Sequence, residues 1–404
     1  MAIEHGEFDV VVVGGGIHGV GVAQAAAAAG YSVQVLEQGS LACATSSRSS
    51  KLIHGGLRYL EHGQVELVRE CLRERSLLLK LAPELVHMRR FYIPVYRSSS
   101  RSRVVVASGL ALYSMLAGGG REVRFHRVPR RQWPEMDGLS SEGLLTVFQY
   151  WDAQTDDRAL TRAVMASAQD LGAQLCEGAE LVSAVRGSDR IEICYRQGGE
   201  EHRCTARALV NAAGPWVNTV LSRVSPEVTP LAFDMVQGTH LVLDAQLEKG
   251  IYYLESPRDA RPVFAMPWRD ERLGDSLLLG TTETLYRGDP AGVHPLPEEQ
   301  AYLLETLERY FPGLGDDGRV RSVFAGLRVL PAGEGGLGAK ARETVLHTGE
   351  HGSEAEAPCV LTIYGGKLTA YRATAEKVVA RLRHVLPDRR RRADTRELPL
   401  APRR

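Results

Sequence analysis

The stretch FDVVVVGGGIHGVGVAQAAAAAGYSVQVLE, Phe8 to Glu37, decides the fold of this chain. Its first six residues are largely apolar and β-branched, which predicts a buried parallel strand over Phe8 to Val13. The strand ends at consecutive glycines, and Gly14, Gly16 and Gly19 follow the spacing G-x-G-x-x-G. In this pattern the first glycine permits a tight turn, the second lets the backbone approach a pyrophosphate, and the third lets a helix pack against the strand.

The elements that follow the glycines complete a dinucleotide-binding unit. A helix is predicted over Ile17 to Ala29, because small and apolar residues continue up to Gly30, a typical C-terminal cap. The N-terminus of such a helix offers backbone N–H groups to phosphate. A second strand, Ser32 to Leu36, ends at Glu37, whose carboxylate can accept hydrogen bonds from ribose hydroxyls. This acid argues against a 2′-phosphate, and therefore against NADP.

The composition is that of an ordinary globular protein. The 404 residues are 44% hydrophobic and 24% charged, and the chain is long enough for two or three domains. Lys plus Arg and Asp plus Glu both number 49, so no overall field attracts nucleic acid. The six cysteines show neither a disulfide framework nor metal-ligand spacing, and we expect no metal and a reducing compartment.

Positive charge is nevertheless concentrated in two regions. One is a run, Arg389 to Arg392, and the other comprises Arg97, Arg101, Arg103, Arg121, Arg124, Arg127, Arg130 and Arg131. Within the second region the apolar stretch Val104 to Leu116 is too short to span a bilayer. We expect it to be a buried helix, and the alternative is a helix that lies in a membrane interface. The arginines fit solvated surface or, alternatively, contact with an anionic membrane.

The α/β pattern continues beyond the cradle in separate pieces. Helices are predicted over Val65 to Lys80, Asp157 to Gly172 and Lys367 to Leu386, the last after a strand at Val360 to Tyr364. Strand candidates between Thr229 and Val323 predict a sheet that covers a substrate. We therefore expect an α/β fold with a discontinuous Rossmann-like cofactor-binding domain (residues 1–90, 150–222 and 322–386), an inserted α+β substrate/cap domain (91–149 and 223–321) and a basic C-terminal tail (387–404).

Four further motifs extend this pattern: ATSSRSSKLIHGGLRYLEH at 44–62, LVNAAGPWV at 209–217, GTTET at 280–284 and GGKLTAYR at 365–372. Together with the cradle, the chain resembles the FAD-dependent glycerol-3-phosphate dehydrogenase family of amino-acid-oxidase-like flavoproteins. The resemblance implies non-covalent FAD, a glutathione-reductase-like architecture, and oxidation of sn-glycerol 3-phosphate to dihydroxyacetone phosphate. It also implies electron transfer to quinone or another acceptor, and a cytoplasmic protein, either free or peripheral on the inner face of the cytoplasmic membrane. Members usually continue into a helical C-terminal domain, which we expect to be absent here.

The same resemblance implies roles for individual residues. His240 is expected to act as the base or to orient the reacting hydroxyl, whereas the residues alone suggest a hydrogen-bonded histidine in a sheet. Arg328 and Lys367 are expected to face the anionic substrate, and Arg58 and Tyr59 to complete its phosphate end. The residues expected to bind FAD are Gly14, Gly16, Ile17, His18, Gly19, Glu37, Gln38, Thr45, Ser46, Ser47, Ser49, Ser50, Lys51, Leu52, Ala213, Gly214, Trp216, Gly326, Gly366, Lys367, Leu368 and Thr369.

Several positions depart from the family pattern. Gln237 stands where a lysine is common, Val329 where a proline is common, and His18 where an asparagine is common. The loss of a cation at Gln237 weakens the case for a phosphate dianion. One alternative is therefore oxidation of a 2-hydroxy acid or an amine, with a carboxylate on Arg328. Another is a non-catalytic flavin-binding module, against which the presence of His240, Arg328 and Lys367 argues.

Overall fold

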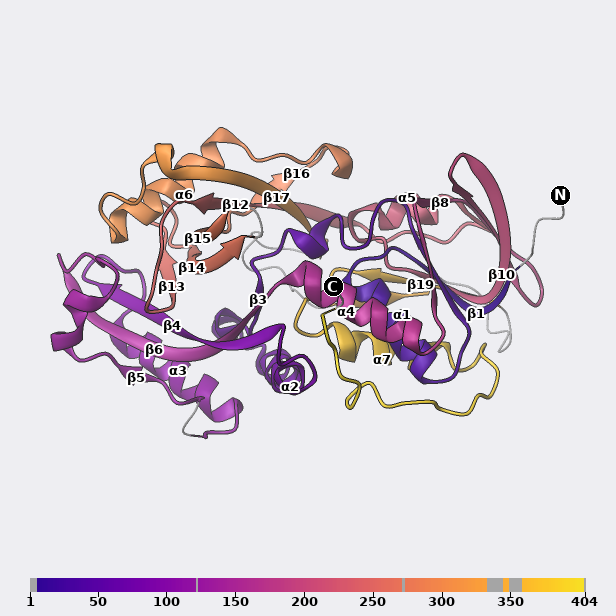
Figure 1. Ribbon diagram of the computed structural model, residues 1–404, viewed down its shortest axis with the longest axis horizontal. Coiled ribbons are helices and arrows are strands. Elements are labelled where there is room, and N and C mark those ends of the chain that lie inside the picture. The colour runs from indigo at the N-terminus through magenta and orange to yellow at the C-terminus, as the bar shows by residue number, and fades with distance from the viewer. Residues whose placement is uncertain (1–5, 121–122, 271–272, 333–343, 349–357, 403–404) are drawn as a thin grey trace.

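The computed structural model describes residues 6–120, 123–270, 273–332, 344–348 and 358–402, and these form two β-sheets with helices packed on them (Figure 1). The first sheet contains β1 (Gly6–Val13), β2 (Val33–Glu37), β7 (Gln174–Glu177), β8 (Ala179–Arg186), β9 (Ile191–Gln197), β10 (Glu200–Asn211), β11 (Val224–Ser225), β18 (Val345–His347) and β19 (Cys359–Tyr364). The second contains β3 (Leu52–Ile53), β4 (Val86–Tyr96), β5 (His126–Arg127), β6 (Leu144–Thr155), β12 (Phe233–Leu243), β13 (Ile251–Glu255), β14 (Pro262–Asp270), β15 (Gly274–Gly280), β16 (Thr284–Tyr286) and β17 (Val320–Pro331). The helices are α1 (Ile17–Ala28), α2 (Val65–Leu81), α3 (Arg103–Leu116), α4 (Asp157–Asp170), α5 (Val217–Leu221), α6 (Pro297–Tyr310) and α7 (Tyr371–Leu382).

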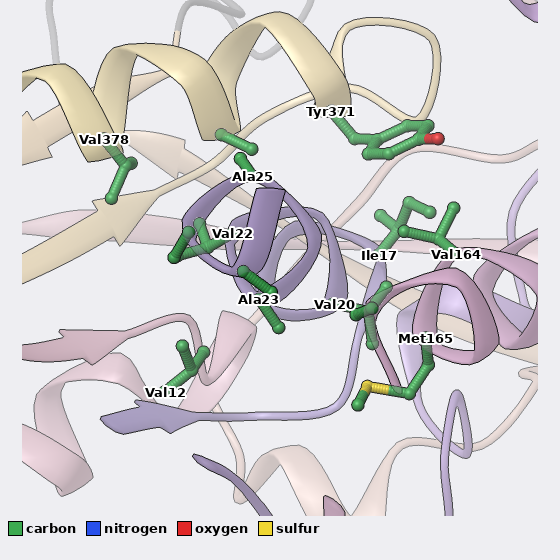
Figure 2. Packing of buried hydrophobic residues seen from close by; sticks show 14 of the residues in the cluster. Val12, Ile17, Val20, Val22, Ala23, Ala25, Val164, Met165, Tyr371 and Val378 are labelled. Atoms are coloured by element: carbon green, nitrogen blue, oxygen red, sulfur yellow. The ribbon is translucent and has the colours of Figure 1, made fainter. Parts of the chain in front are cut away.

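The first sheet is built around the predicted cradle strand. β1 pairs in parallel with β2 on one side and with β10 on the other, and β10 pairs in parallel with β19. Because successive side chains of a strand point to opposite faces, Val10 and Val12 join a core with α1, α4 and α7, whereas Val11 and Val13 join a core with β8, β9 and α5. Figure 2 shows α1 with Val12 of β1 below it, side chains of α7 above it and side chains of α4 beside it.

The second sheet is also buried on both faces. Leu241 and Leu243 of β12 pack with Leu303 and Leu307 of α6, and the intervening Val242 packs on the face covered by α2 and α3. β17 pairs antiparallel with β12 along nearly its whole length. The second sheet therefore extends past residue 322, where we placed the start of the last cofactor-domain segment, because the paired backbone of β12 and β17 is continuous to Pro331. Residues 52–53, 86–90 and 150–155 also belong to the second sheet, through β3, β4 and β6, although we placed them in the cofactor domain; the division into domains otherwise stays a prediction.

Two helix predictions differ from the structure. The expectation that Val104 to Leu116 is a buried helix was wrong, because α3 buries Leu110 and Tyr113 but leaves Val104 68% and Met115 66% exposed. Helix α7 begins at Tyr371 instead of Lys367, so Lys367 lies in the turn before the helix. Among the described residues, no helix combines the length and apolar character needed to cross a membrane.

The basic C-terminal tail packs against the ends of α1 and α2. The backbone N–H of Arg392 donates to the Ala28 carbonyl at the end of α1 (2.8 Å), and that of Leu400 donates to the Leu81 carbonyl at the end of α2 (2.7 Å). Leu400 is itself buried in the core that contains α1. The tail is thus part of the folded structure up to the last residues described.

Candidate active site

One cavity extends from the β1–α1 turn to the second sheet and is lined by residues of both sheets. At its first end lie the carboxyl ends of β1 and β2. The Glu37 carboxylate accepts hydrogen bonds from the backbone N–H groups of Gly15 (2.6 Å) and Gly39 (2.8 Å), and it still faces the cavity. Each carboxylate oxygen can accept more than one hydrogen bond, so Glu37 can hold the turn and a ribose hydroxyl together.

The serine-rich loop after β2 crosses the N-terminus of α1. Ser46 Oγ accepts a hydrogen bond from the backbone N–H of Ile17 (2.8 Å), which is the first residue of the helix. Farther along, the His54 backbone N–H donates to Thr369 Oγ1 (3.1 Å) in the turn that precedes α7. Segments that are more than three hundred residues apart in the sequence therefore form one wall of the cavity.

Most of the predicted site residues line this cavity. They are Gly14, Gly16, Ile17, His18, Glu37, Gln38, Thr45, Ser46, Ser49, Ser50, Leu52, Arg58, Tyr59, Ala213, Gly214, Trp216, Arg328, Gly366, Lys367, Leu368 and Thr369. The roles assigned to them stay predictions, but their positions bring the cradle, the serine-rich loop and the candidate cations to one place.

Five predicted residues do not line the cavity, and packing explains each. Gly19 packs α1 against the turn below it, since a Cβ there would lie 1.9 Å from the Gly14 carbonyl oxygen. Gly326 lets β17 approach the serine-rich loop, since a Cβ there would lie 2.8 Å from the Arg48 carbonyl oxygen. The Ser47 hydroxyl donates to Ala44 within its own loop. The other two, Lys51 and His240, are buried behind the cavity wall.

His240 contacts a residue of the cavity wall, Ser50. Its Nε2 lies 3.0 Å from Ser50 Oγ, and Ser50 lines the cavity. The imidazole is 2% exposed and stacks on Phe324 at 5.0 Å between ring centroids. Burial, with smaller effects of Lys51 and Arg328, lowers the pKa of His240 to about 3, so the ring is neutral near pH 7. The ammonium group of Lys51 pairs with the buried carboxylate of Asp157.

Cationic side chains gather at the opposite end of the cavity, around Glu283. The Oε1 atom of Glu283 lies 3.6 Å from Arg58 Nη1 and 3.5 Å from Arg328 Nη1, and the Glu283 side chain is 7% exposed. Arg328 Nη2 also donates to the Thr282 carbonyl (2.8 Å). Lys367 Nζ lies 4.0 Å from the centroid of the Tyr59 ring, a cation–π distance. Positive charge therefore exceeds negative charge at this end.

Gln237 does not face the cavity, which corrects our interpretation of this departure from the family pattern. Its side chain is 1% exposed, and its Nε2 donates to Glu299 Oε2 (2.6 Å) and to the His294 carbonyl (2.9 Å). The residue therefore replaces a lysine next to a buried carboxylate, away from the cavity. The lack of a cation at this position does not weaken the anion-binding end.

The sequence interpretation missed several residues of the cavity wall, and two of them, Glu283 and Arg261, belong to its charged end. Glu283 belongs to the GTTET motif, so the motif itself contained a signal for it. Arg261 lies in the turn between β13 and β14, and no local pattern marks it, because only the pairing of β14 with β15 brings it beside Glu283. Within the described part of the chain, no three His, Cys, Asp or Glu side chains form a group suited to a metal ion.

Comparison with known proteins places the fold and the cavity in a family. The model of the family described as FAD dependent oxidoreductase matches residues 9–372. A glycerol-3-phosphate dehydrogenase of Pseudomonas aeruginosa is 38% identical over 379 residues, covering 93% of this chain and 71% of the relative. A D-erythritol 1-phosphate dehydrogenase of Brucella abortus is 36% identical over 387 residues, covering 94% and 74%. The glycerol-3-phosphate dehydrogenase from Bacillus halodurans, solved with FAD, superimposes with a TM-score of 0.74 at 24% identity, covering 98% of this chain and 68% of that one.

The cavity fits FAD on its own features. It is continuous from the acid at the end of β2, past the N-terminus of α1, to the second sheet, as an extended adenine dinucleotide with a tricyclic ring requires. The N-cap of α1, Gly16, has an extended backbone and no side-chain cap, which leaves this helix end to the loop and the ligand. The predictions of an FAD-dependent oxidoreductase and of the α/β flavoprotein architecture are confirmed. This chain belongs to the FAD-dependent oxidoreductase family.

Proposed function

We propose that this protein oxidises sn-glycerol 3-phosphate to dihydroxyacetone phosphate. The observation that carries the proposal is the group of cations Arg58, Arg328 and Lys367, which line the same cavity as the Glu37 acid. A phosphate dianion needs several strong donors, and guanidinium groups can bind it through two parallel hydrogen bonds. The 38% identity to a glycerol-3-phosphate dehydrogenase supports the same substrate.

FAD, when bound, supplies the acceptor for the hydride that leaves the substrate carbon. The protein must also hold the reacting hydroxyl and take its proton. Ser50 lines the cavity and His240 lies behind it, so we propose that neutral His240 accepts a hydrogen bond from the Ser50 hydroxyl through Nε2. The Ser50 oxygen then accepts a hydrogen bond from the substrate hydroxyl. When the substrate carbon loses its hydride, the hydroxyl proton passes to the Ser50 oxygen and the Ser50 proton passes to His240 Nε2, which is neutral and can accept it because its pKa is lowered to about 3.

The reaction can be tested by the colour of the flavin. Anaerobic addition of glycerol 3-phosphate to the purified, FAD-loaded protein should bleach the absorbance at about 450 nm that is typical of oxidised flavin. Reduction by a 2-hydroxy acid or an amine, but not by glycerol 3-phosphate, would contradict the proposal and favour a carboxylate on Arg328. No reduction by any donor would favour a non-catalytic module.

A second candidate substrate is erythritol 1-phosphate, because the chain is 36% identical to a dehydrogenase of that compound. It carries the same phosphate end and a longer polyol. The ratio of kcat/KM for the two phosphates decides between them, and the proposal expects the ratio to favour glycerol 3-phosphate.

We further propose that the electrons pass to a quinone and that α3 contacts an anionic membrane. The exposed face of α3 consists of residues spaced four, three and four positions apart, which therefore lie on one side of the helix: Val104, Ser108, Ala111 and Met115. This face carries Val104 and Met115, and the exposed arginines at 103 and 124 lie at and just beyond the two ends of the helix. Apolar side chains flanked by cations suit the headgroup region of anionic lipids. Arg121 lies outside the described residues.

Vesicle sedimentation tests the membrane contact. The protein should pellet with phosphatidylglycerol-containing vesicles, more weakly with pure phosphatidylcholine, and less as the salt concentration rises. The double variant Val104→Asp/Met115→Asp should stay in the supernatant, whereas Val185→Asp, which changes an exposed residue of β8, should bind as the wild type does. Wild-type protein that never pellets would contradict the contact.

For the electron acceptor, we expect a short-chain quinone to reoxidise the reduced flavin faster than oxygen does.

A further inference from the structure

Arg261 is a cavity residue to which the mechanism above gives no role. It lies in the turn between β13 (Ile251–Glu255) and β14 (Pro262–Asp270), and its side chain is 35% exposed. The residue lines the same cavity as Arg58, Arg328 and Lys367. Its contacts show how the guanidinium is held at the cavity wall.

Two contacts hold the Arg261 guanidinium at the cavity, one to a neutral carbonyl and one to a partly exposed carboxylate. Its Nη1 donates to the main-chain carbonyl of Glu283 (2.9 Å), which is a neutral acceptor. Its Nε lies 3.4 Å from Asp259 Oδ2, beyond a normal hydrogen bond, and the backbone N–H of Arg261 donates to the other oxygen of Asp259 (3.1 Å). Asp259 Oδ1 also accepts from the Tyr302 hydroxyl (2.7 Å), so the acid has other partners and holds the turn in place.

Arg261 thus joins Arg58 and Arg328 around the same residue, Glu283. The two other arginines approach the Glu283 side chain, at 3.6 and 3.5 Å, and Arg261 approaches its backbone. Against the carboxylates of Glu283 and Asp259, the three guanidinium groups keep one net positive charge, and Lys367 on the same cavity wall adds a second. A phosphate has three terminal oxygens and more acceptor positions than one bidentate arginine can fill, so a second and third guanidinium add affinity.

We infer that Arg261 is a further substrate-binding residue that contacts the phosphate of a phosphorylated polyol together with Arg58 and Arg328. The inference rests on the proposed function, because it assigns the phosphate of that substrate to this end of the cavity.

The test compares Arg261→Gln with wild type in the FAD-loaded protein. KM for glycerol 3-phosphate should rise at least about tenfold, while kcat changes less than about threefold and the bound FAD is unchanged, because the lost contact is to the non-reacting end of the substrate. Calorimetric titration with inorganic phosphate should show a similar weakening of Kd. Arg261→Lys, which keeps the charge but not the planar fork, should fall between the two.

Arg258→Gln is the matched control. Arg258 lies in the same turn, is 48% exposed, pairs with Glu305 and is absent from the cavity wall, so its loss should leave KM unchanged. Arg261→Gln with wild-type KM and phosphate affinity would overturn the inference, as would an equal effect of Arg258→Gln. Wild-type flavin that glycerol 3-phosphate fails to reduce would instead reject the proposed function, and phosphate affinity would still report on Arg261. If Arg261→Gln does not fold, Arg261→Lys provides the same comparison.

Discussion

Glu299 of α6 is a buried carboxylate on which part of the active site depends, and its replacement tests the structure most directly. It is 5% exposed. Its Oε2 accepts hydrogen bonds from Gln237 Nε2 (2.6 Å) and Thr239 Oγ1 (2.5 Å), and its Oε1 accepts from Thr282 Oγ1 (2.8 Å) and Thr284 Oγ1 (2.7 Å). Burial by itself would raise the pKa of Glu299, but these hydrogen bonds together hold it below its usual value.

The expected cost of Glu299→Ala follows from these donors. A buried donor without a partner costs about 1–3 kcal/mol, and the three threonine hydroxyls can turn toward other acceptors more easily than the Gln237 amide. We therefore expect the free energy of unfolding to fall by about 3–5 kcal/mol, a large part of the roughly 5–15 kcal/mol typical of a domain. Glu299→Gln should lose only about 1–2 kcal/mol, because threonine oxygens can accept from the new amide.

The effect should also reach the substrate. The carbonyl of Thr282 accepts from Arg328 Nη2, and Glu283 follows in the chain, so displacement of Thr282 shifts both partners of the anion site. For Glu299→Gln we expect KM for glycerol 3-phosphate to rise by about three- to tenfold, with kcat nearly unchanged, since about 1 kcal/mol of binding corresponds to about a fivefold change.

Urea denaturation and steady-state kinetics measure the two effects, and Glu298→Ala is the control because Glu298 is the exposed neighbour on the same helix. A Glu299→Ala protein within about 1 kcal/mol of the Glu298→Ala protein would refute the reasoning, because four side-chain donors could not then depend on this carboxylate. A raised kcat with unchanged KM in Glu299→Gln would refute the link to Arg328.

Three further predictions follow from single residues. The pKa of His240 is lowered from 6.5 to about 3, so below pH 6.5 the unfolded state binds a proton that the folded state does not. The free energy of unfolding should therefore decrease as the pH is lowered, by about 1.4 kcal/mol at pH 5.5 relative to neutral pH. His240→Asn should lessen this dependence on pH in urea titrations. Arg328→Ala should raise KM for glycerol 3-phosphate about 30- to 100-fold with FAD retained, as a lost charged hydrogen bond predicts, and unchanged kinetics would reject its role. Gly19→Ala should lower FAD affinity and cost at least about 2 kcal/mol, measured by flavin release and thermal unfolding, because its Cβ would strike the Gly14 carbonyl; Gly109→Ala, with open space around it, should be tolerated.

The cradle was predictable because all of its determinants lie within thirty consecutive residues. Strand, glycines, helix and acid interact with their near neighbours along the chain, so β1, α1 and β2 agree with the prediction to within one or two residues. α4 and β19 were also predictable, since the helical and strand patterns at 157–172 and 360–364 give their positions to within two residues. The serine-rich loop was predictable as a cofactor wall only through its resemblance to a family.

The tertiary structure alone decided which side chains share the site and which are buried behind it. His240 and Gln237 lie in one strand and are 2% and 1% exposed, and only the packing of Ser50 and of Glu299 against that strand determines what each contacts. Arg261 reaches Glu283 through strand pairing across twenty-two residues, and no local pattern encodes such a contact. The sequence by itself determined the cofactor cradle, because local spacing specifies its backbone; the composition of the substrate end was decided by contacts between distant segments, which exist only once both sheets have folded.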